Sequence, residues 1–371
     1  MLDDRFATCL VAALLFAGCL PTPHDPPVDA DEATATEAEP TVDASRPTTI
    51  GTVERLDDRL DALIAIDAAM EVVAEGFEWS EGPVWVPAND AGQGGFLLFS
   101  DVPKNTIYRY GADGHRVWLT PSGYTDETPR GGEPGSNGLT LDAEGQLVLC
   151  QHGDRRVARL DAPWDAPTPT FSTLADRHDG KRFHSPNDLV FDAAGRLYFT
   201  DPPYGLDGGP DGPGREMDFQ GVYRRDPDGS VALLTDTLSR PNGIALSPDE
   251  RTLYVANSDP EHAVWMAWDL SEDGAIENGR VFFDATAWVG DDRPGLPDGL
   301  RVDQGGHLFA TGPGGVLIFS PAGEHLGTLR LPHPAANCAF GEDGSTLFIT
   351  ADFTLLRVPL LTRGLGFDAA D

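Results

Sequence analysis

One unit of strand and turn signals recurs six times along the chain, and this repeat constrains the fold more than any other feature. In each copy two apolar strands flank a turn, as in LVFDAAGRLYFTD ending at Asp201. The second strands of the six copies end at Asp101, Gln151, Asp201, Asn257, Gly312 and Ala351. A period of about 50 residues without helical segments suits four short strands, the size of one propeller blade. The sequence therefore predicts an all-β fold, a six-bladed β-propeller with four-stranded blades.

The sixth copy is short and lacks a fourth strand, so the ring needs a strand from elsewhere to close. Residues 69–79, AMEVVAEGFEW, precede the first copy and read as a strand that completes the last blade. Closure leaves only short, protected sheet edges, which lowers the risk of aggregation. Residues 53–67 carry apolar side chains at helical spacing and predict a short helix on the propeller. We expect the propeller domain to span residues 53–371.

The start of each predicted inner strand carries a side chain with an oxygen atom. These six ring residues are Glu81, Asn137, Asn187, Asn242, Asp298 and Asn337. Because equivalent positions in a propeller surround the central axis, we expect their side chains to converge at one mouth of the channel. Asn-Gly and Asp-Gly turns offer a purely structural explanation for some of them, but Glu is a poor turn residue. Carboxylate and amide oxygens suit a hard cation, which favours Ca²⁺ over Mg²⁺.

Several motifs of the repeat resemble the gluconolactonase and regucalcin (senescence marker protein) family of six-bladed propellers. They include EGPVW from residue 81, HSPNDL from 184, FTDPPYGL from 199, RPNGIALSPDERTLYVANSD from 240 and PDGLRVDQGGHLFATG from 297. The likeness covers about residues 70 to 360 and is strongest to the bacterial gluconolactonase-like branch. It implies metal ligands at Glu81, Asn187, Asn242 and Asp298. It also implies a Ca²⁺ cofactor, with Mg²⁺, Mn²⁺ or Zn²⁺ as other candidates.

This resemblance implies a metal-dependent hydrolase that opens a lactone ring. The cation would polarise the carbonyl group, and Asp298 would act as the catalytic acid/base. Two alternatives remain open: a calcium-dependent phosphotriesterase or arylesterase, and a non-catalytic calcium-binding propeller that serves as a surface binding module. The sequence contains no GxSxG, HExxH or GxxxxGK[ST] motif, which argues against serine esterases, zinc proteases and P-loop nucleotide hydrolases.

Five further residues are candidates for substrate contact: Asn137, His152, His184, Tyr204 and Asn337. His152 follows the second strand of the second copy, and His184 lies three residues before Asn187. Either histidine could act as a general base, although a hydrogen-bonded place in the pocket wall is the commoner fate of such residues. The expected partner is a small-molecule lactone or ester, and we expect a monomer.

The N-terminal segment predicts export. Residues 6–18 form an apolar run that is too short to span a bilayer and ends at Gly18-Cys19. We expect a lipoprotein signal peptide over residues 1–18, with cleavage before Cys19 and lipidation of that thiol. Ordinary secretion and a cytosolic protein with an apolar start are the alternatives. Residues 19–52 are rich in Pro, Thr, Ala and acidic residues and predict a disordered tether.

The predicted compartment is therefore the periplasm or the cell surface of a bacterium, with membrane contact only through the lipid anchor. Asp and Glu number 60 against 26 Lys and Arg, a formal net charge of −34. Such a surface repels phosphate backbones, so we expect no nucleic-acid partner. The chain has four cysteines, and Cys150 and Cys338 lie in apolar strand-like segments that favour buried free thiols over a disulfide.

Overall fold

A computed structural model describes residues 47–89, 92 and 94–367 of the chain. The predicted signal peptide over 1–18, the lipidated Cys19 and most of the predicted tether over 19–52 lie outside the described residues. Within the described part, no helix has the length and apolar character needed to cross a membrane. Cys150 and Cys338 are both free and buried, as their apolar surroundings predicted.

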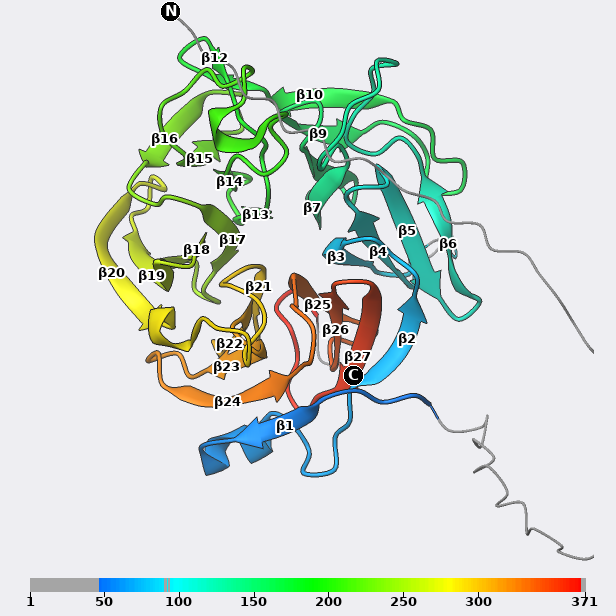
Figure 1. Ribbon diagram of the computed structural model, residues 1–371, viewed down its shortest axis with the longest axis vertical. Coiled ribbons are helices and arrows are strands. Elements are labelled where there is room, and N and C mark those ends of the chain that lie inside the picture. The colour runs from blue at the N-terminus through cyan, green and yellow to red at the C-terminus, as the bar shows by residue number, and fades with distance from the viewer. Residues whose placement is uncertain (1–46, 90–91, 93, 368–371) are drawn as a thin grey trace, which may run out of the picture. The chain divides into compact units, whose positions relative to one another are not determined.

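The described residues fold into six antiparallel sheets around a central axis, which confirms the predicted six-bladed propeller (Figure 1). The strands of each blade run in order from the axis to the rim. Blade 1 consists of β3 (Ser80–Val86), β4 (Phe96–Asp101), β5 (Thr106–Gly111) and β6 (Gly114–Leu119). Blade 2 consists of β7 (Ser136–Leu141), β8 (Leu147–Gln151), β9 (Arg156–Leu160) and β10 (Phe171–Ala175). Blade 3 consists of β13 (Leu189–Phe191), β14 (Leu197–Asp201), β15 (Gly221–Arg225) and β16 (Val231–Thr235).

The second half of the ring repeats this arrangement. Blade 4 consists of β17 (Pro241–Leu246), β18 (Thr252–Asp259), β19 (His262–Leu270) and β20 (Ile276–Asp284). Blade 5 consists of β21 (Leu300–Val302), β22 (Leu308–Gly312), β23 (Gly315–Phe319) and β24 (His325–Arg330). Blade 6 consists of β25 (Asn337–Gly341), β26 (Thr346–Ala351), β27 (Thr354–Pro359) and β2 (Glu71–Glu75). A small hairpin, β11 (Arg177–His178) and β12 (Lys181–Arg182), separates blades 2 and 3.

Strand β2 closes the ring, as the sequence predicted for residues 69–79. It forms the outer edge of blade 6 by pairing with β27, with Glu71 opposite Arg357. Arg357 Nε donates to Glu71 Oε2 over 2.8 Å at this seam. The outermost strand of blade 6 therefore comes from the opposite end of the sequence to the other three strands, and no long sheet edge remains open there.

The predicted helix over residues 53–67 is wrong in extent. Residues Thr52–Arg55 form β1, a fifth strand that pairs with β24 at the rim of blade 5. Only Asp58–Ala62 is helical, as the short 3₁₀ helix η1. Hydrogen bonding to the free edge of β24 outweighs the helical preference of residues 52–55. The helical spacing of the apolar residues still places Leu60 and Ile64 in the core beneath blades 5 and 6.

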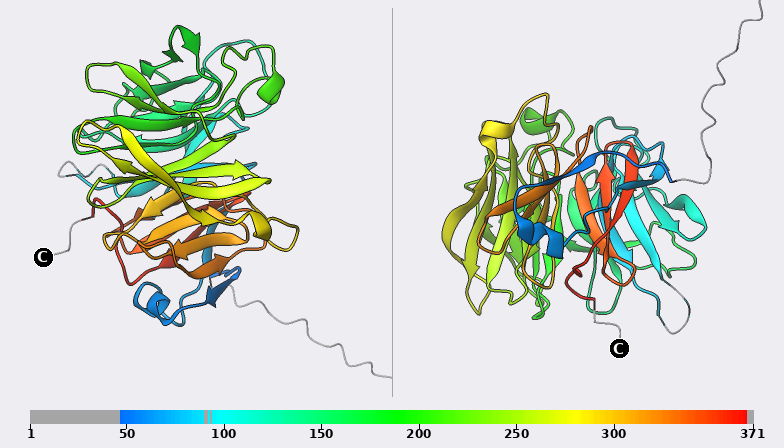
Figure 2. Two further views of the ribbon diagram at one scale, coloured as in Figure 1. Left: turned by 90° about the vertical axis from the view of Figure 1, so that its left-hand side faces the viewer. Right: turned by 90° about the horizontal axis from the view of Figure 1, so that it is seen from below.

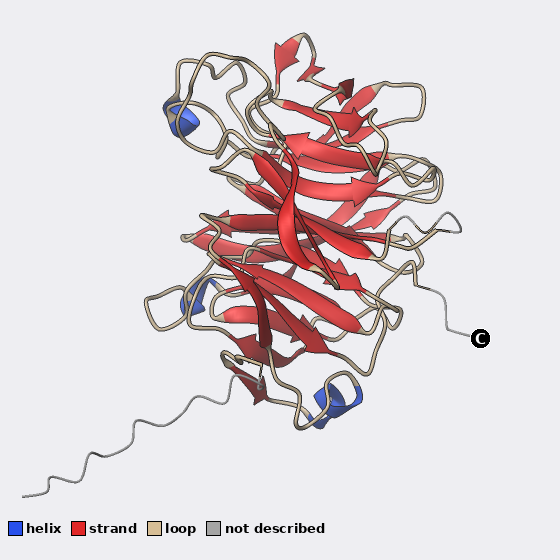
Figure 3. Cartoon of the chain, turned by 90° about the vertical axis from the view of Figure 1, so that its right-hand side faces the viewer, coloured by secondary structure: helices blue, strands red, loops and turns tan. Residues whose placement is uncertain are grey.

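The core lies between the faces of neighbouring blades. Second strands such as β4 and β14 are buried at every residue, because each blade is covered on both faces. Between blades 2 and 3, for example, Phe183, Phe199 and Tyr223 pack against Val148. Figure 2 shows the sheets from the side, face against face. Figure 3 shows that the helical turns, including η2 (Gly209–Asp211) and η3 (Thr286–Trp288), lie in loops outside the blades.

Candidate functional site at one mouth of the channel

The ring residues open the inner strands, as the repeat predicted. Four of them lie within β3, β7, β17 and β25, while Asn187 and Asp298 lie two residues before β13 and β21. All except Asn337 line one pocket of about 500 Å³ at one mouth of the channel. Asn337 stands next to them and donates a side-chain hydrogen bond to Glu81. The structure therefore brings the six side chains together from six blades.

The residue that follows each ring residue allows the ring residue of the next blade to approach closely. It is glycine in four blades: Gly82, Gly138, Gly243 and Gly299. A Cβ atom on Gly243 would lie 2.2 Å from the backbone oxygen of Asp298, and one on Gly299 would lie 2.0 Å from Cγ of Asn337. Gly138 and Gly243 lie inside strands, so a turn does not explain them. Glycine is needed because the next blade's ring residue occupies the space of a side chain.

Hydroxyl groups on the second strands tie neighbouring blades together at the ring. Ser100 Oγ donates to the backbone oxygen of Asn137 over 2.9 Å, and Thr200 Oγ1 donates to that of Asn242 over 2.7 Å. Thr311 Oγ1 repeats the contact on Ala336, the residue before Asn337. Each hydroxyl stands one residue before the end of its second strand and reaches the next blade. These bonds fix the height of the ring residues along the axis.

Oxygen-bearing residues at the ends of the second strands hold the loops that carry the ring residues. Asp201 accepts the backbone N–H groups of His184 and Ser185 over 2.9 and 2.8 Å. Asp101 does the same for Glu78 and Trp79 at the entry to β3. The sequence repeat shows these positions only as strand ends. Their role depends on loops that return to the same blade, so spacing alone does not reveal it.

Two carboxyl groups of the ring are buried without a cationic partner. Burial raises the pKa of Glu81 to about 8, and the neighbouring charges of Asp188 and Glu133 add to this effect. Burial also raises the pKa of Asp298 well above its usual range, with the charge of Glu81 as the next cause. Within the described residues, neither carboxyl group forms an ion pair with Lys, Arg or His. The two carboxyl groups therefore favour a bound proton or a bound cation.

The side-chain oxygens of this ring fit a hard divalent cation. Oδ1 of Asp298 and Oδ1 of Asn137 are buried and have no hydrogen-bond partner in the described part of the chain. Unpartnered buried oxygens are costly and call for a positively charged or proton-donating group. The described residues contain no cluster of three or more His, Cys, Asp or Glu side chains that could hold a metal. A cation here would depend on carboxamide oxygens beside two carboxylates, a donor set that suits Ca²⁺ more than Zn²⁺.

Glu133 and Tyr204 form part of the pocket wall. Glu133 lies 3.5 Å, Oε2 to Nδ1, from His152, which is fully buried behind it. Neither ring nitrogen of His152 makes a hydrogen bond within the described residues. Tyr204 lines the pocket with a buried hydroxyl group, and burial together with the charge of Asp298 raises the pKa of Tyr204. His152 thus contacts the pocket through Glu133, while Tyr204 faces it directly.

His184 is fully buried and does not line the pocket. Its Nε2 lies 3.1 Å from the backbone oxygen of Met217, which indicates a donating Nε2–H. Burial lowers the pKa of His184, so the neutral ring is favoured. These contacts describe a histidine that anchors the loop before Asn187, and we do not propose it as a substrate contact.

Two pocket residues, Glu133 and Arg293, come from loops outside the repeat and escape sequence reasoning. Trp79 and Arg240 also line the pocket, but each stands two residues before a ring residue, so these two share an equivalent position in the repeat. Glu133 belongs to the connection between blades 1 and 2, and Arg293 to the long loop before β21. Their distance along the chain from the ring residues varies from blade to blade. A search for equivalent positions in each repeat therefore cannot find them.

Comparison with known proteins shows the family of this chain. The family model described as "SMP-30/Gluconolactonase/LRE-like region" matches residues 79–352. A gluconolactonase of Zymomonas mobilis is 40% identical over 361 residues, covering 93% of this chain and 97% of the relative. A pentonolactonase of Haloferax volcanii is 27% identical, covering 75% of this chain and 83% of its own. The solved structure of a gluconolactonase from Xanthomonas campestris is 32% identical with a TM-score of 0.71, covering 86% of this chain and 99% of that structure. The chain belongs to the SMP-30/gluconolactonase/LRE-like family.

Proposed function

We propose that the chain hydrolyses the ring ester of a small lactone, with a divalent cation held by Glu81, Asn187, Asn242 and Asp298. The observation that carries this proposal is the convergence of two buried carboxyl groups and several carboxamide groups on one pocket without a cationic partner in the described residues. Ca²⁺ fits this oxygen-only set better than Mg²⁺, Mn²⁺ or Zn²⁺. The 40% identity to a gluconolactonase over nearly the whole chain supports the reaction class.

A cation bound by these oxygens would polarise the lactone carbonyl group and stabilise negative charge on its oxygen. In the proposed reaction, Asp298 Oδ1 takes a proton from the water molecule that adds to the carbonyl carbon. The same atom returns the proton to the ring oxygen when the ring C–O bond breaks, so the product is a hydroxy acid. The positive charge of a bound cation would keep Asp298 ionised, so that its carboxylate can accept this proton.

The pocket wall supplies groups that could orient a lactone with several hydroxyl groups. Glu133 can accept hydrogen bonds from such hydroxyls, and the buried His152 behind it restricts its position. Asn137 adds an Oδ1 atom that has no partner in the described residues, and Tyr204 adds a phenol group. A polyhydroxylated sugar lactone matches these polar contacts better than an apolar ester, since unpaired buried polar groups would oppose binding of the latter.

The test is hydrolysis of glucono-1,5-lactone by the full chain, followed as acid release at mildly acidic pH, where spontaneous ring opening is slower. The protein is stripped with a chelator and assayed before and after Ca²⁺ is restored. Asp298→Asn is compared with Asp269→Asn, a matched change at an exposed aspartate of blade 4 that pairs with Arg280. Calcium binding to each variant is measured by titration calorimetry.

Calcium-dependent turnover that disappears in Asp298→Asn but persists in Asp269→Asn would support the proposal. Tight calcium binding without turnover of any lactone would contradict the lactonase proposal. A phosphotriesterase or arylesterase would then be tested with the corresponding esters, and failure there would favour a calcium-binding module. Turnover that is unchanged by the chelator would remove the cation from the proposal. Export, lipidation at Cys19 and a monomeric state remain proposals from the sequence.

A further inference from the structure

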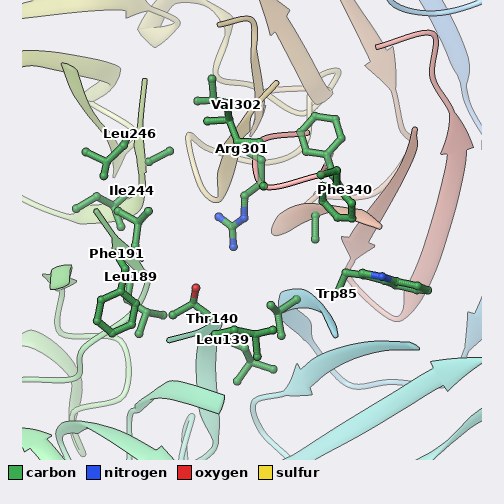
Figure 4. Close-up of a pocket in the computed structure, with 18 of the residues that line it drawn as sticks. Trp85, Leu139, Thr140, Leu189, Phe191, Ile244, Leu246, Arg301, Val302 and Phe340 are labelled. Atoms are coloured by element: carbon green, nitrogen blue, oxygen red, sulfur yellow. The ribbon is translucent and has the colours of Figure 1, made fainter. Parts of the chain in front are cut away.

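A second pocket of about 590 Å³ opens at the other mouth of the channel. Residues two to four positions beyond the ring residues contribute to its wall from all six blades, and residues 365–367 and parts of nearby loops complete it. The wall is mostly apolar, with Trp85, Phe191, Leu246 and Phe340 among its larger side chains (Figure 4). A volume of this size lies within the range of about 300–1,000 Å³ that is typical of small-molecule sites.

One cationic side chain enters this apolar pocket. Arg301 of β21 points its guanidinium toward the middle of the space, as Figure 4 shows. Its Nη1 donates to the backbone oxygen of Leu300 over 2.7 Å and lies 3.4 Å from Oδ2 of the buried Asp188. The side-chain hydrogen bonds of Arg301 to the described residues all use Nη1, which leaves Nε and Nη2 without a partner there, and the side chain is 21% exposed. One edge of the guanidinium is therefore held, and the other is available.

We propose that this pocket binds a small monocarboxylate with an apolar body, such as a medium-chain alkyl or an aryl acid. The carboxylate would pair with the free edge of Arg301, where two parallel N–H groups match its two oxygens. The apolar part would bury surface against the wall, which contributes about 25 cal/mol per Å². This site is separate from the proposed lactone site and does not depend on that activity.

The surroundings of Arg301 favour a singly charged ligand. Asp188 already lies on one side of the guanidinium, so a dianion such as phosphate would meet a nearby negative charge. Glu250 also lines the pocket, but its Oε1 accepts the backbone N–H of Ala193 over 2.9 Å. A sugar acid is a poor fit because most of its hydroxyl groups would face apolar side chains without hydrogen-bond partners. The wall and the single free cationic edge thus select an amphipathic monoanion.

Titration calorimetry of the full chain with octanoate tests this site, with octanamide as the neutral probe of the same length. Two variants address the pocket. Arg301→Gln removes the charge, and Thr140→Phe fills the space without touching the ion pair, because Thr140 lines the pocket. Arg280→Gln is the matched control, since Arg280 lies at the exposed rim of blade 4. Thermal melting of every variant checks that it folds.

We expect octanoate to bind wild type and Arg280→Gln equally, and octanamide to bind at least tenfold more weakly. Arg301→Gln should weaken octanoate binding at least tenfold, and folded Thr140→Phe should abolish it. Binding that survives Thr140→Phe would overturn the proposal, as would equal affinity for octanamide. Failure of octanoate to bind wild type would also overturn it. If gluconate competes with octanoate, octanoate binds at the other mouth of the channel, and the proposal is also overturned.

Discussion

The guanidinium of Arg301 in blade 5 reaches the buried carboxyl group of Asp188 in blade 3, with Nη1 3.4 Å from Oδ2. Asp188 takes the position that glycine occupies after the ring residue in four other blades. Its charge lies close enough to Glu81 and Asp298 to raise the pKa of both. Arg301 is thus a cation that partly balances the acidic side chains along the channel, and it enters from the end opposite the candidate site.

Replacing Arg301 by Met should destabilise the fold because Asp188 would remain buried without its partner. We expect a loss of about 2–4 kcal/mol in the free energy of unfolding, measured by urea denaturation. The double variant Arg301→Met with Asp188→Asn should recover part of this loss. The matched change Arg280→Met removes a partner of the half-exposed Asp269 and should cost less than about 0.5 kcal/mol. Equal effects at both arginines would contradict the interpretation.

Asp201 should make the stability of the fold depend on pH. Burial raises the pKa of Asp201 to about 7 from its usual value near 3.8. Between these values the unfolded chain has released the proton and the folded chain still binds it, so stability falls as pH rises. The contribution is fully present below pH 4 and is lost as the pH rises through 7, on the order of 4 kcal/mol. Urea unfolding at several pH values and constant calcium measures this slope.

Asp201→Asn should flatten that slope, because the carboxamide cannot ionise. It keeps an oxygen for only one of the N–H groups of His184 and Ser185, which donate to different oxygens of Asp201, so a constant loss of stability accompanies the flatter slope. Asp343→Asn is the control. Hydrogen bonds from Ser345 lower the pKa of Asp343, so its titration lies below the range tested. A stability difference between wild type and Asp201→Asn that stays constant from pH 4.5 to 7.5 would show that Asp201 does not titrate there.

Glu133→Gln should lower kcat/KM for glucono-1,5-lactone about tenfold, since a hydrogen bond to a charged group contributes about 1.5–3 kcal/mol. δ-Valerolactone has no hydroxyl groups and should show little change with the same variant. Glu127→Gln alters an exposed residue of the same loop and serves as the control. An equal loss for both lactones would indicate that Glu133 acts on the reacting ester and not on substrate hydroxyls.

Gly243→Ala should disturb the ring because its Cβ atom would lie 2.2 Å from the backbone oxygen of Asp298. We expect a loss of about 1–3 kcal/mol in stability together with weaker calcium binding, since Asp298 must move. At Gly131 a Cβ atom would meet nothing within 4 Å, so Gly131→Ala is the matched control. Unfolding in urea and calcium titration are both measured. Unchanged calcium affinity in folded Gly243→Ala would argue against Asp298 as a ligand.

The fold could be predicted from the sequence because a propeller repeats one local pattern. The alternation of apolar strands and Asp/Gly turns recurs in all six blades. The missing outer strand of blade 6 pointed to residues 69–79 near the other end of the sequence, where Glu71–Glu75 form β2. The prediction erred at residues 52–55, where helical spacing competed with the open edge of β24. A free sheet edge is a tertiary feature, and the local periodicity of apolar residues does not reveal it.

For the candidate site, too, one part could be predicted from the sequence and the other part could not. The sequence by itself determined the register of Glu81, Asn187, Asn242 and Asp298, because symmetry turns equal positions in each repeat into neighbours around the axis. Only the tertiary structure decided which residues complete the walls. Glu133 and Arg293 come from loops of unequal length, and His152 turned out to stand behind Glu133. The contact between Asp188 and Arg301 crosses the channel between blades that are not adjacent, so its geometry exists only when the ring has closed.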